Sequence, residues 1–288
     1  MDVELSVHTN AREFLDAVGK PLYASEPENN LILGVSERLE KYPGSCKNPF
    51  FASVTDQAGA LILATVMTPP HNMILAGGDN SQQGFALLFS HLEENSIDIP
   101  GLIGPKQIID RVLKDWLQNT KFEWKVTMRQ RIYALNDVSL PMIPPGSFQK
   151  ARTEHVPVIA SWLQKFEAES LAETHPVDIE RAGRLVNGGF MFVWEKDSEI
   201  VSMAMKTRPI KHSISIGCVY TPKDHRRKGY ATALVACLSQ HLLDQGYDFV
   251  TLFTDLDNPT SNSIYMKIGY QMVCDFKQVT FRSKKSTG

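Results

Sequence analysis

The chain has 288 residues, of which 43% are hydrophobic and 22% are charged, and its formal net charge at pH 7 is −2. This composition is typical of a globular protein, and the small net charge argues against a bulk affinity for nucleic acid or for an anionic membrane. The four cysteines lie far apart, without a C-x-x-C pair or a metal-ligand spacing, so we expect reduced thiols and no bound metal. The sequence also lacks an apolar run long enough to span a bilayer and a basic-then-apolar N-terminal signal, which predicts a cytoplasmic protein.

A chain of this length suits two domains of roughly 140 residues better than one. The predicted boundary is the segment from Asn136 to Phe148, because it contains three prolines and a glycine. We therefore predict a first domain over residues 1–136 and a second domain over residues 148–288.

Alternating and helical patterns predict the elements of each half. In the first half they indicate, in chain order, a strand Glu4–His8, helices Ala11–Val18 and Leu31–Leu39, strands Phe50–Val54, Ala60–Met67 and Asn72–Ala76, a helix Gln83–Glu94, a strand Gly101–Ile103, a helix Pro105–Leu117 and a strand Lys125–Tyr133. In the second half they indicate a strand Phe148–Ala151, helices Glu154–Glu167 and Pro176–Val186, strands Phe190–Trp194, Ile200–Thr207 and Ser213–Tyr220, a helix after Gly229, a strand Phe249–Phe253, a helix after Pro259, and closing strands near Tyr270 and Val279. The two series follow the same order, which favours two copies of one mixed α/β unit over a chance similarity of two α/β halves.

A basic turn lies between the strand Ser213–Tyr220 and the helix after Gly229. The turn reads His225, Arg226, Arg227, Lys228, and then Gly229. The first N–H groups of a helix have no partner within the helix, and the helix dipole is positive at that end. A glycine there lets a ligand approach the backbone closely. The turn therefore predicts a binding site for a phosphate group.

The residues and spacing of two sequence blocks indicate a protein family. Arg226-x-x-Gly229-x-Ala231 resembles the Arg/Gln-x-x-Gly-x-Gly/Ala signature of GNAT-type N-acetyltransferases, in which successive amides hold the pyrophosphate of acetyl-CoA. The later block from Asn258 through Asn262 and Tyr265 to Gly269-Tyr270 resembles the family's second motif. The resemblance covers about half of the chain and implies two tandem GNAT-like α/β units, each a mixed sheet flanked by helices. The layout also resembles a bacterial group of predicted acetyltransferases and, more loosely, glycine N-acyltransferase-like enzymes.

The resemblance implies roles for particular residues. The pantetheine arm of acetyl-CoA would lie along the strand that ends at Val219 and Tyr220, whose backbone groups would bind it; packing of the core is the alternative for their side chains. Asn262 would hydrogen-bond the arm, and Asn258 is equally well explained as the N-cap of a helix with Pro259 at its first position. The pyrophosphate would be held by the amides of the turn, with charge from Arg226 or Lys228; the residues concerned are Arg226, Arg227, Lys228, Gly229, Tyr230, Ala231 and Thr232.

One departure from the family pattern lies in the turn itself. Many members have a glycine where this chain has Arg227, and a left-handed conformation at that position would cost about 1 kcal/mol. The resemblance also implies that Tyr265 points at the thioester sulfur, where a phenol can protonate the departing thiolate. A core aromatic is the alternative for Tyr265. No general base is assigned, because a residue of each candidate's kind is more often found at a surface or loop position than as a base: Glu195, Glu167, Glu169, Asp255 and His212.

The first half carries a weaker copy of the same pattern. Ser81-x-x-Gly84-x-Ala86 stands about half a chain length before the second turn, but it has no basic run. The segment Pro105–Trp116 replaces the second block and has neither its asparagines nor its tyrosine. We therefore expect a degenerate copy without a cofactor site, and one CoA per chain.

The predicted function is acetyl-CoA-dependent transfer of an acetyl group to a primary amine of a small molecule or peptide, by direct attack in a ternary complex. No cysteine has the context of a nucleophile, so a covalent acyl-enzyme is not expected. The alternatives are a CoA-binding sensor without turnover and an acyltransferase that uses a longer acyl-CoA. Nucleic acid and membrane are not expected as partners.

Overall fold

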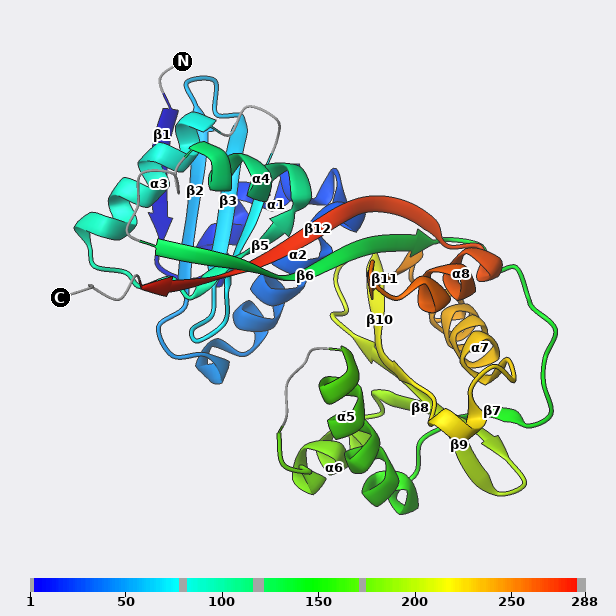
Figure 1. Cartoon of the computed structure of the whole chain (residues 1–288). Coiled ribbons are helices and arrows are strands. Elements are labelled where there is room, and N and C mark those ends of the chain that lie inside the picture. The colour runs from blue at the N-terminus through cyan, green and yellow to red at the C-terminus, as the bar shows by residue number, and fades with distance from the viewer. Residues whose placement is uncertain (1–2, 78–81, 116–121, 171–174, 284–288) are drawn as a thin grey trace. The chain divides into compact units, whose positions relative to one another are not determined.

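The computed structural model describes residues 3–77, 82–115, 122–170 and 175–283 (Figure 1). The chain divides into two compact units. The first contains residues 1–130 and 274–288, and the second contains residues 131–273. No helix of the described ranges combines the length and the hydropathy that a membrane span requires.

The first unit is a mixed sheet with helices. Its elements are β1 (Val3–His8), α1 (Ala11–Tyr23), α2 (Glu26–Lys41), β2 (Phe50–Asp56), β3 (Leu61–Met67), β4 (Met73–Gly77), α3 (Gln82–Glu94), β5 (Gly101–Pro105), α4 (Lys106–Asp115), most of β6 (Phe122–Leu135) and most of β12 (Gln271–Ser283). Strands β1 to β5 follow one another in the sheet, and β12 pairs with β5. All of these pairs are antiparallel except the parallel pair of β4 and β5.

The second unit repeats this order. Its elements are β7 (Ser147–Lys150), α5 (Val156–Ser170), α6 (Ile179–Asn187), β8 (Met191–Lys196), β9 (Glu199–Thr207), β10 (Ser213–Tyr220), α7 (Tyr230–Asp244), β11 (Phe249–Asp255) and α8 (Pro259–Ile268), with the end of β6 beside β11. Strands β7 to β10 are joined by antiparallel pairs, and β10 and β11 form the parallel pair. In chain order, each half of the sequence therefore runs through a strand, two helices, three strands, a helix, a strand, a helix and a strand, as the repeated sequence pattern predicts.

The boundaries of the units differ from the predicted domains. Both divisions fall inside strands, between Gln130 and Arg131 in β6 and between Val273 and Cys274 in β12. The two closing strands expected near Tyr270 and Val279 are one strand, β12. Its residues Phe276–Thr280 pair with β5, so the end of the chain belongs to the first unit. Local periodicity cannot reveal this, because the partner strand is far away in the sequence.

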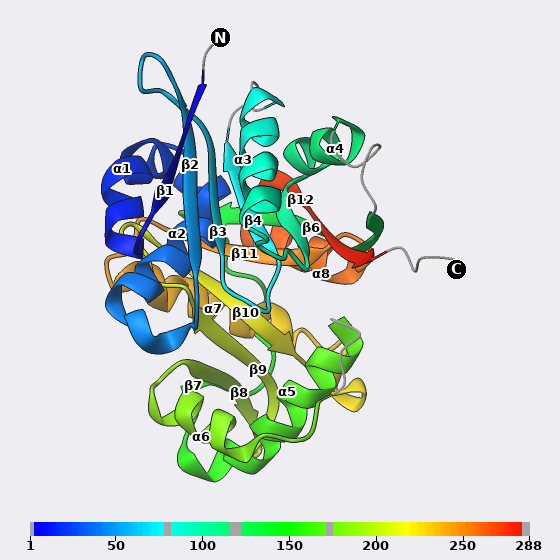
Figure 2. The ribbon, with the colours of Figure 1, turned by 90° about the vertical axis from the view of Figure 1, so that its left-hand side faces the viewer.

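Two apolar clusters enclose the sheet of the second unit. On one face, side chains of α7 such as Leu234 and Leu238 pack on Ile216 and Leu252 of the strands. On the other face, Leu163 of α5 packs in a cluster with Tyr220 of β10. Figure 2, turned by a right angle from Figure 1, shows α5 and α7 on opposite sides of β9 and β10. Strand β10 is therefore held from both faces, which fixes the position of its C-terminal end.

Candidate functional site

The parallel strands β10 and β11 separate before they end. Their pairing runs from Ser213 opposite Phe249 to Ile216 opposite Leu252. Beyond that point β10 continues to Tyr220 and β11 continues to Asp255. Backbone groups of the separated stretch are not used by a ladder between these two strands, so an extended ligand can pair with them as an added strand would.

A β-bulge reshapes β10 within the separated stretch. Pairing with β9 passes from Gly217 opposite Met205 to Tyr220 opposite Met203, so β10 has one residue more than its partner. Cys218, inside the bulge, has a φ of 50°, which is in the left-handed region. The bulge places Val219 and Tyr220 beside the opening, as expected for the two residues predicted to bind the acyl arm.

The residues after the bulge are held by a buried serine. The Ser202 hydroxyl on β9 donates a hydrogen bond to the Tyr220 carbonyl at 3.2 Å, and it lies 2.9 Å from the Thr221 hydroxyl. Tyr220 itself is buried against Trp162 of α5, with ring centroids 5.9 Å apart. The carbonyl of Tyr220 is therefore occupied, and its position is fixed from both sides of the sheet.

The predicted phosphate turn has the geometry that its sequence indicates. Gly229 is the N-cap of α7, with a φ of 85°. Arg227 has a φ of 62°, the left-handed conformation that an arginine adopts at a cost of about 1 kcal/mol. A glycine N-cap has no side chain to satisfy the first amides of the helix, which belong to Tyr230, Ala231 and Thr232. These amides stand at the positive end of the helix dipole and can bind an anion.

Packing does not explain the glycine at position 229. A β-carbon there would meet only Pro144 Cγ among the described atoms within 4 Å, at 3.9 Å. The corresponding glycine of the first unit differs, since Gly84 lies inside α3 and a β-carbon would meet Ile62 Cγ2 at 3.3 Å and Val54 Cγ1 at 3.4 Å. Gly84 is a packing residue of a helix, whereas Gly229 is a left-handed cap beside open space. Ser81, the first residue of the weaker motif, lies outside the described residues.

The three cations of the turn have different surroundings. Arg226 donates from Nη2 to Glu169 Oε2 at 2.6 Å and from Nε to the Thr221 carbonyl at 2.8 Å. Lys228 donates from Nζ to the Asp224 carbonyl at 2.7 Å, and no described carboxylate forms an ion pair with it. Arg227 is exposed. The ion pair of Arg226 is about 40% exposed on both sides, and such pairs are worth at most about 1 kcal/mol, so an anion at the turn can compete with Glu169.

Asn262 of the second block fastens α8 to the end of β11. Asn262 Nδ2 donates to the carbonyls of Asp255 at 3.1 Å and Asn258 at 2.9 Å. Its Oδ1 accepts a hydrogen bond from the Tyr133 hydroxyl at 3.3 Å. The two amide hydrogens of Asn262 are thus engaged within the protein, so its direct contact with a ligand stays a prediction. Asn258 directly precedes α8, where the alternative role as a cap places it.

Tyr265 lies one turn further along α8 than Asn262 and is buried. Its ring packs between Tyr133, at 6.5 Å, and Tyr270, at 6.0 Å between centroids. Burial raises the pKa of Tyr265 to about 12. Within the described ranges, no residue hydrogen-bonds the Tyr265 hydroxyl. A phenol in this state keeps its proton at neutral pH, which a general acid requires.

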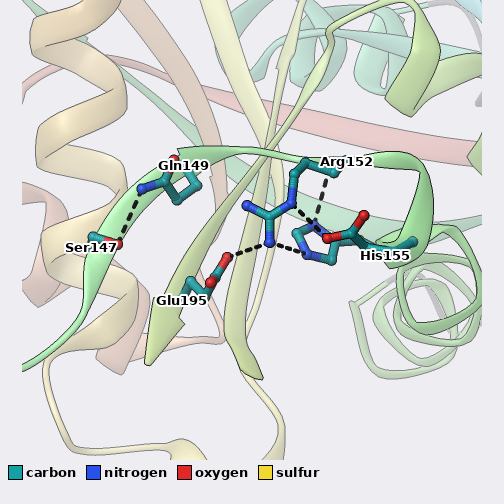
Figure 3. Close-up of polar contacts among 6 residues, drawn as sticks. Ser147, Gln149, Arg152, His155 and Glu195 are labelled. Carbon is teal, nitrogen blue, oxygen red and sulfur yellow. Dashed lines mark hydrogen bonds and ion pairs between the residues drawn. The ribbon is translucent and has the colours of Figure 1, made fainter. Parts of the chain in front are cut away.

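Most of the candidate bases are engaged in ion pairs. Figure 3 shows Arg152 between Glu195 and His155, with Arg152 Nη2 3.0 Å from Glu195 Oε2. Glu167 Oε1 accepts from Arg181 Nη1 at 2.5 Å, and Glu169 pairs with Arg226. The remaining two differ: Asp255 ends β11 at the opening and accepts a hydrogen bond from the Asp257 amide at 2.9 Å, while His212 lies before β10, at its other end. None is assigned as the base.

Sequence reasoning missed two residues of the site. Tyr133 comes from β6, and only the sheet order places that strand beside β11. Ser202 lies in the middle of β9, where a buried serine in a strand is the only local signal. Metal ligands were not expected, and the described part of the chain contains no group of three His, Cys, Asp or Glu residues that could hold a metal ion.

The second unit combines an open parallel strand pair, a bulge and a glycine-capped helix. Residues 156–270 match the family model described as the acetyltransferase (GNAT) family. This segment, which contains both sequence blocks, is therefore similar to GNAT acetyltransferases. No curated protein sequence matches the chain.

Solved structures resemble the whole chain at low identity. A Drosophila protein has a TM-score of 0.68 at 13% identity, with 98% of this chain and 99% of that chain covered. A GCN5-related N-acetyltransferase from Sphaerobacter thermophilus has a TM-score of 0.65 at 12% identity, with 97% and 95% covered. A tandem GNAT protein from the clavulanic acid biosynthesis pathway has a TM-score of 0.57 at 12% identity and covers both chains fully, at 100% each. These similarities show the fold: two GNAT-like units in tandem.

Proposed function

We propose that this protein transfers an acetyl group from acetyl-CoA to a primary amine of a small molecule or peptide. The observation that carries the proposal is the combination, within one unit, of a strand pair that opens and a helix whose first amides have no side-chain cap. The long acylated arm of acetyl-CoA needs an open strand pair, and its diphosphate needs free amides at a helix start that follows the first of these strands in the chain. The cofactor is acetyl-CoA, and no metal is required.

The pyrophosphate of acetyl-CoA is bound by the amides from Arg227 to Thr232. Lys228 contributes positive charge, and so does Arg226 once it exchanges Glu169 for the pyrophosphate. The arm pairs with the backbone beside Val219 and Tyr220, where β10 has left β11. Open space at Gly229 and the left-handed backbone there support this assignment, because no packing partner accounts for either.

Acetyl-CoA supplies an acetyl group on a thioester, which the neutral amine nitrogen attacks directly. A carbon–nitrogen bond forms, the carbon–sulfur bond breaks, and the ammonium proton leaves to a base. Tyr265 donates its proton to the departing thiolate, a step that a placed acid accelerates by about 10²–10⁴-fold. Cys218, in the bulge, is a poor nucleophile, because burial raises the pKa of its thiol to about 11. This favours direct transfer over an acyl-enzyme.

The first unit is proposed to be a degenerate copy that binds no CoA. Its glycine lies within a helix and is packed against β2 and β3 side chains, so the helix offers no left-handed cap at that position. One CoA per chain is therefore expected.

A sensor without turnover is the second candidate. It is favoured by one observation: Glu167, Glu169 and Glu195 are all engaged in ion pairs with arginines. Calorimetric titration with acetyl-CoA, followed by a thiol-release assay with a panel of amines, separates the two. Binding with amine-stimulated thiol release supports the enzyme, binding without it supports the sensor, and absence of binding refutes both. The same titration with longer acyl-CoA thioesters tests the acyl length.

A further inference from the structure

An arginine stands at the point where β10 and β11 separate. Arg208 directly follows β9 and has a φ of 47°. Its guanidinium lies over the ring of Phe253 on β11, 5.2 Å from the centroid. The residue before Phe253, Leu252, is the last one that pairs with β10. Because strand side chains alternate and Leu252 packs under α7, Phe253 and the arginine on it lie on the opposite face.

Apart from the Phe253 ring, Arg208 has no hydrogen-bond or ion-pair partner among the residues that the structure describes. Its Nε is buried without a hydrogen bond, and the guanidinium forms no ion pair with a described carboxylate. Burial lowers the pKa of Arg208 to about 10, so the group remains charged at neutral pH. Arg208 is partly buried, and its buried Nε is left without a hydrogen bond, an arrangement that native proteins usually satisfy with a partner or a ligand.

Neighbouring arginines of the same unit behave differently. The positive charges of Arg181 and Arg208 both lower the pKa of the Cys218 thiol, whereas burial raises it. Arg181, however, is neutralised by Glu167 at 2.5 Å, and Arg226 is neutralised by Glu169 at 2.6 Å. Of these three arginines, Arg208 alone has no counter-ion among the described residues, and unlike the exposed Arg227 it has a buried Nε.

The place of Arg208 indicates what it binds. Its charge acts on Cys218 in the bulge, and its guanidinium lies on Phe253, directly after the last residue of β11 that pairs with β10. The phosphates of CoA have their own amides and cations, so this cation is left for the second substrate. A guanidinium presents a planar pair of donors that fits a carboxylate in two parallel hydrogen bonds.

We propose that Arg208 binds a carboxylate of the acceptor, so that the acceptor is an amino acid or another amine with a carboxylate close to the reacting nitrogen. The inference rests on the proposed function, because it assumes that an amine reacts at this opening. It narrows the acceptor from any primary amine to one that carries a carboxylate, and it assigns the residue that binds that carboxylate.

The test compares amino acids with their amides, which keep the amine and side chain but lack the charge. Thiol release from acetyl-CoA is measured for each pair with the full-length protein, with Arg208→Gln, with Arg208→Lys and with Arg184→Gln as a control for the loss of an exposed arginine on α6. We expect the wild-type protein and Arg184→Gln to have a kcat/KM at least tenfold higher for the acids than for the amides. Arg208→Gln should lose this preference, mainly through KM for the acids, with the amides unchanged, and Arg208→Lys should keep part of it.

Several outcomes overturn the inference. Equal rates with acids and amides in the wild-type protein do so without any variant, as does turnover with uncharged amines only. If Arg208→Gln loses affinity for acetyl-CoA, or loses affinity only for thioesters with an acidic acyl group, then Arg208 binds an anionic group of the acyl donor and not of the acceptor. Failure of the wild-type protein to bind acetyl-CoA is a separate result, which refutes the proposed function itself.

Discussion

Replacement of Gly229 should reduce acetyl-CoA affinity much more than it reduces the free energy of unfolding. The glycine caps α7 with a φ of 85°, and a β-carbon there would touch only Pro144 Cγ, at 3.9 Å. A Gly229→Ala substitution therefore brings the strain of a left-handed alanine, about 1–2 kcal/mol, but no clash within the described protein. The β-carbon instead stands in the space that we assign to the pyrophosphate.

The loss of affinity should be much larger than the loss of stability. Charge-assisted hydrogen bonds contribute about 1.5–3 kcal/mol each, so moving the pyrophosphate away from two amides removes about 3–6 kcal/mol. We therefore expect acetyl-CoA affinity to fall at least 100-fold in Gly229→Ala, and binding to be abolished in Gly229→Val. Calorimetric titration measures the affinity, and chemical denaturation measures the free energy of unfolding.

Gly246 provides a matched control. It follows the other end of α7 with a φ of 96°, and a β-carbon there meets nothing within 4 Å. Gly246→Ala should therefore destabilise the protein by a similar amount and leave acetyl-CoA affinity unchanged. Near-wild-type affinity in Gly229→Val would refute the phosphate-binding role of the turn, and an equal loss of affinity in both variants would attribute it to stability.

Four further predictions follow from the same geometry. Tyr265→Phe should keep acetyl-CoA affinity and lower turnover at least tenfold, whereas unchanged turnover would make Tyr265 a core residue. Glu169→Gln should strengthen acetyl-CoA binding by up to about fivefold, because it releases Arg226 from an ion pair worth about 1 kcal/mol. Arg226→Gln should weaken acetyl-CoA binding. An unchanged affinity in both variants would show that Arg226 does not bind the phosphate. Burial, and next the charge of Arg152, lowers the pKa of His155 in the folded protein, so the unfolded state binds the proton more readily. The contribution of His155 to stability is therefore full above its unfolded pKa and is lost as the pH falls through that value. His155→Gln should reduce the pH dependence of the unfolding free energy measured between about pH 7 and 5. Titration of the full-length protein should give one CoA per chain, and two would refute the degenerate-copy hypothesis.

Local patterns predicted the elements well, because these depend on neighbours in the sequence, whereas the phosphate-binding role of the turn stays a prediction. The apolar periodicity after Gly229 indicated the start of a helix, and α7 begins at the next residue. The repeated order of strands and helices likewise predicted both units. The boundaries of helices were less accurate: α2 begins at Glu26, before the expected Leu31, and Pro105 ends β5 instead of beginning a helix.

Long-range pairing was not predictable from the same patterns. The partner of β12 is β5, which lies far back in the sequence, and periodicity carries no information about such a partner. The contact of Tyr133 with Asn262 depends on β6 lying beside β11. Arg208 gave no signal at all in the sequence, because its significance comes from a missing counter-ion, which only the folded surroundings can show.

The most direct test of the account is a single experiment on wild-type protein and Gly229→Val with acetyl-CoA and a panel of amines. Free thiol and acetylated amine are quantified together, by a thiol reagent and by mass spectrometry. The account predicts equal amounts of the two products with the wild-type protein and neither product above background with the variant. Acetyl-CoA binding by the wild-type protein without any acetylated amine, or equal product from both proteins, would contradict it.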